Sequence, residues 1–300
     1  MLDVVIIGSG PAGITAAIYA KRANLNVAVV EKEYLGTGQI AESSRVDNYP
    51  GIPGIDGYSL GEKFREHAES LGVEFTEAQV LSLGQKDGIW IIGCDEDITL
   101  ESKAVIYATG CKNRPLGVPG EEKYYGRGLS FCAVCDGAFY KGKRVAVIGG
   151  GDTALDDAMY LSDICEKVYL VHRREFFRGS ASTLEKLKQK ENVEIIVNVR
   201  VEEITGDKKI DGIILDNKTK LNISGLFAAV GMIPQTELLK EFGVLDESNY
   251  VKASEDTKTT VNGLFAAGDV RTKQLRQVVT AAADGANAIT SVEHYLSETH

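Results

Sequence analysis

Two cysteines separated by two residues form the most reactive motif of this sequence, the segment Cys132–Gly137, which reads Cys-Ala-Val-Cys-Asp-Gly. Cysteines at this spacing can close a small disulfide ring, especially at a turn that leads into a helix. The N-terminus of a helix stabilises a thiolate, and the thiolate is the attacking species in disulfide exchange. Asp136 follows directly and could exchange a proton with the dithiol. The motif therefore predicts a redox-active pair, Cys132 and Cys135, with Asp136 as acid and base.

Two other interpretations of these residues are weaker. A structural zinc site needs two further ligands, usually a second cysteine pair or paired histidines. The remaining cysteines, Cys94, Cys111 and Cys165, are scattered singly, and the four histidines show no ligand spacing, so we expect no metal. We expect these three cysteines to be small buried hydrophobic residues. Asp136 with Gly137 could form only a turn, which leaves the acid–base role of Asp136 open.

A glycine-rich motif, Gly8–Gly13, lies near the start of the chain. It follows the apolar segment Val4–Ile7, a predicted strand, and precedes small residues from 14 to 23, a predicted helix. Glycines in this setting let a pyrophosphate approach backbone N–H groups at the helix N-terminus. A second predicted strand, Val27–Val30, ends in Glu31, where an acid can bind a ribose hydroxyl. A glycine-rich turn without a ligand is the alternative. The predicted dinucleotide site comprises Gly8, Gly10, Pro11, Ala12, Gly13 and Glu31.

A second glycine-rich motif, Gly149–Ala154, repeats this order of elements. It follows the predicted strand Arg144–Ile148 and opens a predicted helix that runs to about Leu161. We expect Asp156 and Asp157 to lie on the solvated face of that helix. The predicted second nucleotide site comprises Gly149, Gly151, Asp152, Thr153 and Ala154.

Basic side chains follow the next predicted strand, Val168–Val171, as His172, Arg173, Arg174 and Arg178. An acid at this position would repel a 2′-phosphate, whereas arginine binds it through paired, charge-assisted hydrogen bonds. We therefore expect the second site to prefer NADPH over NADH, with a basic surface cluster as the alternative. The acid at the first site suits FAD or NAD. One flavin site and one nicotinamide site together predict a hydride-transfer enzyme.

Length and composition restrict the class of protein. The chain has 300 residues, enough for about two domains, with 44% hydrophobic and 25% charged residues, as in ordinary globular proteins. No run approaches the roughly 18 apolar residues that span a bilayer. The formal charge of −10 argues against nucleic acid or an anionic membrane as a partner. Five cysteines form no secreted disulfide framework, and residues 1–7 predict a strand rather than a signal peptide, so we expect a cytoplasmic protein.

Taken together, these motifs make the chain resemble the low-molecular-weight thioredoxin reductases, flavoproteins of the pyridine nucleotide–disulfide oxidoreductase class. The Cys-x-x-Cys-Asp-Gly motif is quite specific to this family and its near relatives. Besides the motifs above, the matching segments are Gly38-Gln39, Asn48–Gly51, Tyr107–Gly110, Gly126–Gly128, Gly231–Pro234, Phe265–Val270 and Arg276-Gln277.

The resemblance implies which residues bind the two cofactors. Asp269 would contact the ribityl or pyrophosphate region of FAD, and Arg276 with Gln277 would lie near its isoalloxazine ring. His172 and the arginines would belong to the NADPH site. The residues that the resemblance adds to the FAD site are Gly38, Gln39, Asn48, Thr109, Gly110, Gly268, Asp269, Arg276, Gln277 and Val278.

The resemblance also implies an α/β fold with two Rossmann-like, three-layer ββα nucleotide-binding domains. Residues 1–115 and 235–300 would form the FAD-binding domain. Residues 116–234 would form an inserted NADPH-binding domain that carries the dithiol. Both boundaries fall in segments that hold the glycine and proline expected of linkers.

In the reaction implied by the resemblance, NADPH reduces FAD, and reduced flavin opens the Cys132–Cys135 disulfide. Cys135 would face the flavin, Cys132 would attack the disulfide of thioredoxin, and Asp136 would protonate the leaving thiolate. The dithiol and the nicotinamide site lie on one inserted domain and must both reach one flavin. We therefore expect a domain rotation about the two linkers. A homodimer is expected from the family, and Arg127 is a candidate contact for thioredoxin.

Two alternatives stay open. A relative that oxidises small-molecule dithiols would share most of these motifs. A flavin-bound redox sensor without turnover would not need a complete NADPH site, and NADPH-dependent turnover would exclude it. Members that take electrons from ferredoxin lack the second fingerprint and arginine cluster that this chain has.

Overall fold

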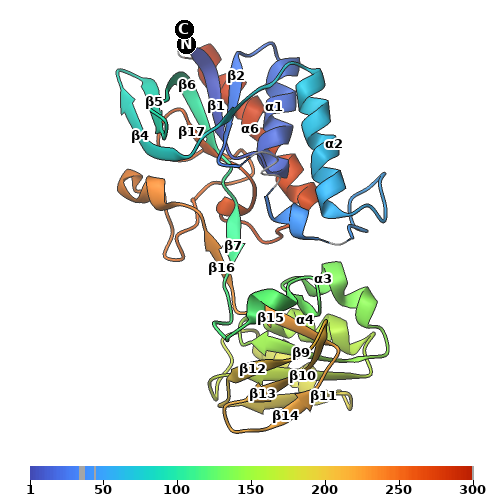
Figure 1. Ribbon diagram of the computed structural model, residues 1–300. Coiled ribbons are helices and arrows are strands. Elements are labelled where there is room, and N and C mark those ends of the chain that lie inside the picture. Colours follow the sequence, from blue (N-terminus) through green and yellow to red (C-terminus); the bar gives the residue numbers. More distant parts are fainter. Residues whose placement is uncertain (34–37, 44, 299–300) are drawn as a thin grey trace. The chain divides into compact units, whose positions relative to one another are not determined.

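The computed structural model describes residues 1–33, 38–43 and 45–298, and the chain forms two compact units (Figure 1). Unit 1 consists of Met1–Lys112 with Ile233–His300, and unit 2 consists of the inserted segment Asn113–Met232. Strands β7 (Cys111–Asn113) and β16 (Met232–Pro234) pair with each other where the chain passes between the units. The domain boundaries expected from sequence, after residues 115 and 234, lie within a few residues of this pair of strands.

A seven-stranded sheet forms the centre of unit 1, in the order β3-β2-β1-β6-β5-β4, with β17 also paired to β6. Strands β1, β2, β3, β6 and β17 pair in parallel, whereas β4, β5 and β6 pair antiparallel. Residues 99–102 of β6 pair with β5, and residues 105–107 pair with β17. The bounds are β1 Leu2–Ile7, β2 Val27–Glu31, β3 Glu74–Glu77, β4 Val80–Lys86, β5 Ile89–Cys94, β6 Thr99–Tyr107 and β17 Leu264–Ala266.

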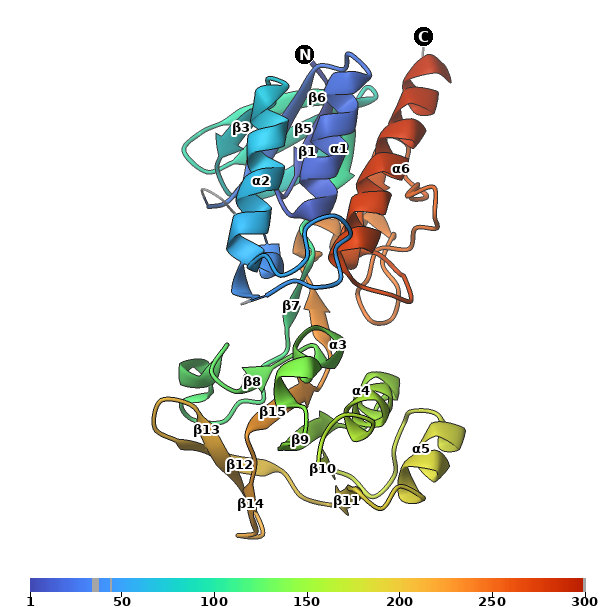
Figure 2. The same ribbon diagram turned by 90° about the vertical axis from the view of Figure 1, so that its right-hand side faces the viewer.

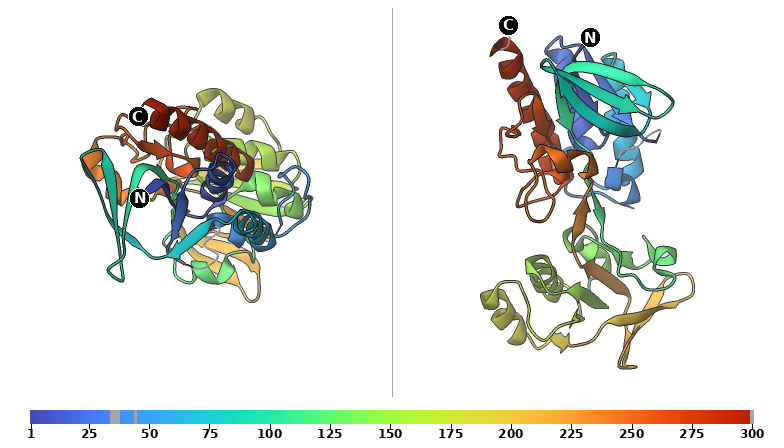
Figure 3. Two further views of the ribbon diagram at one scale, coloured as in Figure 1. Left: turned by 90° about the horizontal axis from the view of Figure 1, so that it is seen from above. Right: turned by 90° about the vertical axis from the view of Figure 1, so that its left-hand side faces the viewer.

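Three helices cover one face of this sheet, and they are α1 Pro11–Arg22, α2 Gly57–Ser70 and α6 Val278–Glu298 (Figure 2). The opposite side of unit 1, where β4 and β5 lie, faces the viewer in the right-hand view of Figure 3. The side chains of successive β1 residues point to opposite faces of the sheet. Val4 and Ile6 pack with α1 and α6, whereas Val5 and Ile7 belong to a second hydrophobic core on the other face. Helices α1 and α6 pack so closely that a Cβ added at Gly285 would lie 2.3 Å from the Ala12 carbonyl oxygen.

Unit 2 has three layers. Its parallel sheet has the order β11-β10-β9-β15-β8, and a separate antiparallel sheet has the order β12-β13-β14. Val145 and Val147 of β9 pack with helix α4, whereas Ala146 and Ile148 join the core of the antiparallel sheet. The bounds are β8 Leu129–Ser130, α3 Ala133–Asp136, β9 Arg144–Gly149, α4 Asp152–Ser162, β10 Lys167–His172, α5 Ala181–Lys188, β11 Val193–Val197, β12 Val201–Gly206, β13 Ile210–Leu215, β14 Lys220–Asn222 and β15 Gly225–Ala229. The predicted α/β fold class is confirmed.

Two local predictions were wrong. Helix α1 begins at Pro11, inside the glycine motif, rather than at residue 14, because proline needs no N–H partner at the first helical position. Asp156 of α4 is exposed as expected, but Asp157 is half-buried. Asp157 precedes Tyr160 by three residues and therefore shares the helix face that packs on Gly137. Burial and the charge of Asp156 raise the pKa of Asp157 from 3.8 to about 7.

Candidate active site

The Cys132–Cys135 pair is a disulfide, as predicted, with the two Cα atoms 5.3 Å apart. Cys132 caps the short helix α3, and the backbone N–H of Cys135 donates to Cys132 Sγ at 3.2 Å. This donor would stabilise negative charge on Cys132 Sγ after the disulfide opens. Both cysteines are half-buried, and Val134 between them has 57% of its surface exposed. The other three cysteines are buried and free, as expected.

Asp136 lies at the end of α3 and is held by a serine that the sequence analysis did not identify. Ser130 Oγ donates to Asp136 Oδ2 at 2.6 Å and accepts from the backbone N–H of Cys132 at 3.1 Å. Burial raises the pKa of Asp136, and the hydrogen bond from Ser130 opposes this effect only in part. The dithiol thus has a carboxyl group beside it that holds its proton more tightly than an ordinary aspartate.

The segment that carries the dithiol packs directly on helix α4. A Cβ added at Gly137 would lie 2.7 Å from the Tyr160 ring and 3.0 Å from Leu161 Cδ2. Only glycine therefore permits this close approach. The contact fixes α3 within unit 2, next to the helix that begins at the second glycine motif.

The first glycine motif forms a tight cradle between β1 and α1. Gly8 has a φ of +107°, and its added Cβ would lie 2.5 Å from the Ala108 carbonyl oxygen. At Gly13 an added Cβ would lie 1.9 Å from the Gly8 carbonyl oxygen. Gly10 caps α1 without a side-chain hydrogen bond, and Pro11 opens the helix. The cradle thus leaves the N–H groups of the first helical turn for a phosphate.

Glu31, at the end of β2, is only 3% exposed. Its Oε1 accepts a short hydrogen bond from Arg65 of α2, and Arg65 also donates to Glu69 at 2.6 Å. Arg65 lies over the Phe75 ring at 3.4 Å. The second carboxylate oxygen of Glu31, Oε2, is buried without a hydrogen-bond partner among the described residues. A ribose hydroxyl would satisfy it.

Gly268 and Asp269 form the third part of this site. Gly268 has a φ of +81°, and its added Cβ would lie 2.9 Å from Ala12 Cβ, so the turn approaches the first glycine motif. Burial raises the pKa of Asp269, and the charges of Lys273 and Arg276 oppose the rise. Asp269 Oδ1 is buried and has no hydrogen-bond partner within the described part of the chain.

The remaining residues expected at the FAD site lie around this turn or on loops of unit 1. Arg276 Nε donates to the Asp269 carbonyl oxygen at 3.3 Å, and its guanidinium lies over the Tyr250 ring at 4.2 Å. Asn48 Nδ2 donates to Gln277 Oε1 at 2.8 Å, which joins two predicted residues that are far apart in sequence. Five further predicted residues lie in turns or helices of unit 1. Gly38 begins a 3₁₀ helix that includes Gln39, and Val278 begins α6. Thr109 Oγ1 donates to the Gln235 carbonyl oxygen at 2.7 Å, and Gly110 has a φ of +67°.

These features fit a bound dinucleotide. Two buried carboxylate oxygens, on Glu31 and Asp269, lack hydrogen-bond partners among the described residues. Glycines at positions 8, 13 and 268 let segments of unit 1 approach each other where a side chain would collide, which brings the Gly268–Asp269 turn against the first glycine motif. A ligand that supplies hydroxyl donors would satisfy the two oxygens, and the N-terminus of α1 would face its pyrophosphate.

The second glycine motif forms a similar cradle in unit 2. A Cβ added at Gly149 would lie 2.3 Å from the Ala229 carbonyl oxygen, and Gly151 caps α4 without a side-chain hydrogen bond. Asp152 Oδ1 accepts from the backbone N–H of Ser180 at 2.7 Å. Thr153 is exposed, whereas Ala154 is buried beneath the turn.

His172 is buried, and its ring lies where a Cβ of Gly150 would be, 2.2 Å from the nearest ring atom. Its Nε2 is 3.3 Å from the Phe176 carbonyl oxygen, and its ring packs on Phe177. Burial lowers the pKa of His172, and the three nearby arginines lower it further. His172 therefore supports the glycine turn from within the unit.

Arg173, Arg174 and Arg178 are exposed, and none forms an ion pair with a carboxylate of the residues that the structure describes. The backbone N–H of Arg178 donates to the Gly150 carbonyl oxygen at 2.7 Å, which ties the arginine segment to the glycine turn. Three exposed cations, none paired with a carboxylate in the described part of the chain, therefore lie next to a glycine turn that could receive a phosphate.

Comparison with known proteins places the chain in a family. Residues 2–285 match the pyridine nucleotide-disulphide oxidoreductase family model. A thioredoxin reductase from Bacillus subtilis is 39% identical over 99% of this chain and 95% of that protein. The crystal structure of a thioredoxin reductase from Streptococcus pyogenes is 40% identical, with a TM-score of 0.92 over 99% of both chains. A thioredoxin reductase from Lactococcus lactis in the FR conformation is 37% identical over 99% of this chain and 100% of that one, with a TM-score of 0.70.

None of the helices that the structure describes is both long and apolar enough to cross a bilayer. The predicted resemblance is confirmed by relatives that match the chain over nearly its whole length. The chain belongs to the pyridine nucleotide–disulphide oxidoreductase family, and it is an oxidoreductase of the low-molecular-weight thioredoxin reductase group.

Proposed function

We propose that this protein reduces the disulfide of thioredoxin with electrons from NADPH, through FAD and the Cys132–Cys135 dithiol. The observation that carries the proposal is the Cys132–Cys135 disulfide, followed directly by Asp136, a half-buried residue whose pKa is raised by burial. The names of the relatives support thioredoxin as the substrate.

The two cradles support the choice of cofactors. Unit 1 would hold FAD, with Glu31 at the ribose, the N-terminus of α1 at the pyrophosphate, and Asp269 at a hydroxyl of the flavin half. Unit 2 would hold NADPH, with Arg173, Arg174 and Arg178 at the 2′-phosphate. When bound, FAD would relay the two electrons of an NADPH hydride to the disulfide.

The residues of the dithiol segment then carry the exchange. Once the disulfide is reduced, the N–H of Cys135 holds negative charge on Cys132 Sγ, which makes Cys132 the attacking thiolate. Cys132 Sγ bonds to one sulfur of the thioredoxin disulfide, and the other sulfur leaves and takes a proton from Asp136. Cys135 then attacks Cys132 Sγ, so the Cys132–Cys135 bond forms again and the second thioredoxin thiol is released.

A rotation of residues 116–234 relative to residues 1–115 and 235–300 would let one flavin meet first NADPH and then the dithiol. Two solved relatives support such a motion. Their identities to this chain are similar, 40% and 37%, but their TM-scores are 0.92 and 0.70. Relatives of similar sequence identity to this chain thus differ from each other in whole-chain shape. We also expect the protein to be a cytoplasmic homodimer. Light scattering would measure the mass of the particle in solution.

The test is steady-state reduction of thioredoxin disulfide with NADPH. We expect turnover by the wild-type protein and a loss of at least about a thousandfold in Cys132→Ser and Cys135→Ser, because each variant lacks one sulfur of the exchange. Both variants should still bleach their flavin with NADPH. Flavin reduction by NADPH without thioredoxin turnover would reject thioredoxin as the acceptor.

A further inference from the structure

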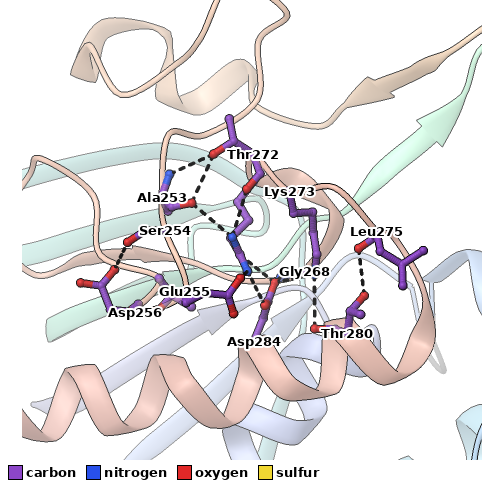
Figure 4. Close-up of polar contacts among 12 residues, drawn as sticks. Ala253, Ser254, Glu255, Asp256, Gly268, Thr272, Lys273, Leu275, Thr280 and Asp284 are labelled. Carbon is purple, nitrogen blue, oxygen red and sulfur yellow. Dashed lines mark hydrogen bonds and ion pairs between the residues drawn. The ribbon is translucent and has the colours of Figure 1, made fainter. Parts of the chain in front are cut away.

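A cluster of buried charges lies beside the Gly268–Asp269 turn in unit 1 (Figure 4). It consists of Arg271, Lys273 and Asp284, whose side chains are 3%, 6% and 3% exposed. None of the three was singled out by its sequence pattern. Because charges this deeply buried are costly, their arrangement calls for a functional account.

Asp284 of α6 is the centre of the cluster. Its Oδ2 accepts hydrogen bonds from the backbone N–H of Gly268 at 2.9 Å, from Arg271 Nε at 2.8 Å and from Lys273 Nζ at 2.8 Å. Its Oδ1 accepts from the second Arg271 nitrogen at 2.7 Å. Figure 4 shows Asp284 pointing from the helix toward Gly268 and Lys273. Burial opposes ionisation of Asp284, but the hydrogen bonds from Arg271 and Lys273 outweigh it and lower its pKa.

The two cations extend the cluster to other segments of unit 1. Arg271 donates to the carbonyl oxygens of Ala253, at 3.2 Å, and Thr272, at 3.0 Å. Lys273 donates to the carbonyl oxygen of Thr280 in the first turn of α6 at 3.3 Å. The cluster therefore connects the loop after β17 to α6 and to the chain segment at Ala253.

The hydrogen bond from the Gly268 N–H to Asp284 distinguishes this cluster from an ion pair that only stabilises the fold. Gly268 has a left-handed φ of +81° and touches Ala12 of the first glycine motif, so its orientation decides where Asp269 lies. Burial and the charge of Asp284 raise the pKa of Asp269, and the charges of Lys273 and Arg276 oppose the rise, so the cluster also acts electrostatically on Asp269.

We infer that Asp284, with Arg271 and Lys273, positions the Gly268–Asp269 turn so that Asp269 Oδ1 meets a hydroxyl of the bound flavin dinucleotide. The inference rests on the proposed function, because it takes the ligand of unit 1 to be FAD. Asp284, Arg271 and Lys273 act through Gly268 and Asp269 and are positioning residues.

The test is titration of FAD into flavin-free protein, with the dissociation constant as the readout. Asp284→Asn removes the charge that holds both cations, and Lys273→Met leaves the Arg271–Asp284 pair in place. We expect Asp284→Asn to weaken FAD binding by at least about tenfold, because a charge-assisted contact orients the turn, and Lys273→Met to weaken it by less. The matched control is Val292→Ala, a core change on the same helix at a residue that is 0% exposed.

A double-mutant cycle with Asp269→Asn separates positioning from general stability. If Asp284 acts through Asp269, Asp284→Asn should change FAD binding by less than about twofold in the Asp269→Asn background. An equal loss in both backgrounds, or a loss of the same size in Val292→Ala, would overturn the inference. So would unchanged FAD binding by both Asp284→Asn and Lys273→Met. Wild-type protein that does not bind FAD would instead reject the proposed function.

Discussion

Each of the two glycine motifs joins a strand to the N-terminus of a helix, and the two motifs are surrounded by opposite charges. In unit 1 the strand after the turn ends in Glu31, which is 3% exposed and paired with Arg65. In unit 2 the equivalent strand is followed by three exposed arginines. A buried, pre-oriented carboxylate suits a ligand that stays bound, whereas exposed cations suit a ligand that arrives and leaves. Under the proposed function, the backbone would provide the phosphate cradle, and the side chains at the strand end would select the nucleotide.

The largest expected effect comes from removing the charge of the second site. Changing Arg173, Arg174 and Arg178 together to alanine should reduce the preference for NADPH over NADH by up to about a thousandfold, because three charge-assisted contacts are lost. The ratio of the two kcat/KM values measures this. Arg200→Ala, at an exposed arginine elsewhere in unit 2, is the control and should leave the ratio unchanged. A preserved preference in the triple variant would mean that the two sites do not differ as described.

The dithiol lies in unit 2, and Asp136 should affect the rate of its exchange with thioredoxin. Asp136→Asn should slow thioredoxin reduction by about a hundredfold, because no acid then protonates the leaving thiolate. Burial raises the pKa of Asp136, so the protonated form persists to higher pH than usual. Wild-type turnover should therefore fall as the pH rises through this raised pKa, and the variant should lack that decline. Exposed Asp216→Asn is the control, and equal pH profiles in wild type and Asp136→Asn would contradict the role.

Removing the acid of the first site should have a smaller and separate effect. Glu31→Gln should weaken FAD binding by about tenfold, because a neutral amide is a poorer acceptor for a ribose hydroxyl than a carboxylate. The preference for NADPH should not change. Glu77→Gln, at the exposed end of the neighbouring strand β3, should bind FAD as the wild type does. A Glu31→Gln variant with altered nucleotide preference would show that the two sites are not independent.

The smallest effect concerns stability. The pKa of Asp157 rises from 3.8 to about 7 on folding, so between these values the folded chain holds a proton that the unfolded chain releases. Stability is therefore lost as the pH rises through this window. Asp157→Asn should gain on the order of 1 kcal/mol over wild type by pH 8, and less at pH 5. Urea unfolding at both pH values measures this, and a pH-independent difference would mean that Asp157 titrates normally.

Local patterns predicted the parts of the molecule that are built from neighbouring residues. The strand, glycine turn and helix at Gly8–Gly13 lie within one stretch of chain, and the Cys132–Cys135 pair spans only four residues. Their geometry follows from glycine conformations and from short ring closure, which sequence displays directly.

Contacts between distant segments could not be predicted in the same way. Arg65 forms an ion pair with Glu31, and Asp284 accepts a hydrogen bond from the backbone N–H of Gly268. No sequence motif near Arg65 or near Asp284 indicates these partners. Asp157 shares a helix face with Tyr160, which packs on Gly137, and periodicity alone does not reveal that this face of α4 is covered. Tertiary packing decides these cases, because an amphipathic pattern gives the face of a helix but not what covers it.

The central claim is that the two cradles hold different nucleotides and pass electrons in one direction. Anaerobic stopped-flow mixing of the oxidised, flavin-loaded protein with NADPH, and separately with NADH, tests it most directly through the flavin absorbance. The account predicts rapid, stoichiometric bleaching with NADPH and much slower bleaching with NADH at equal concentration. Equal rates with the two nucleotides, or no bleaching with NADPH, would contradict it.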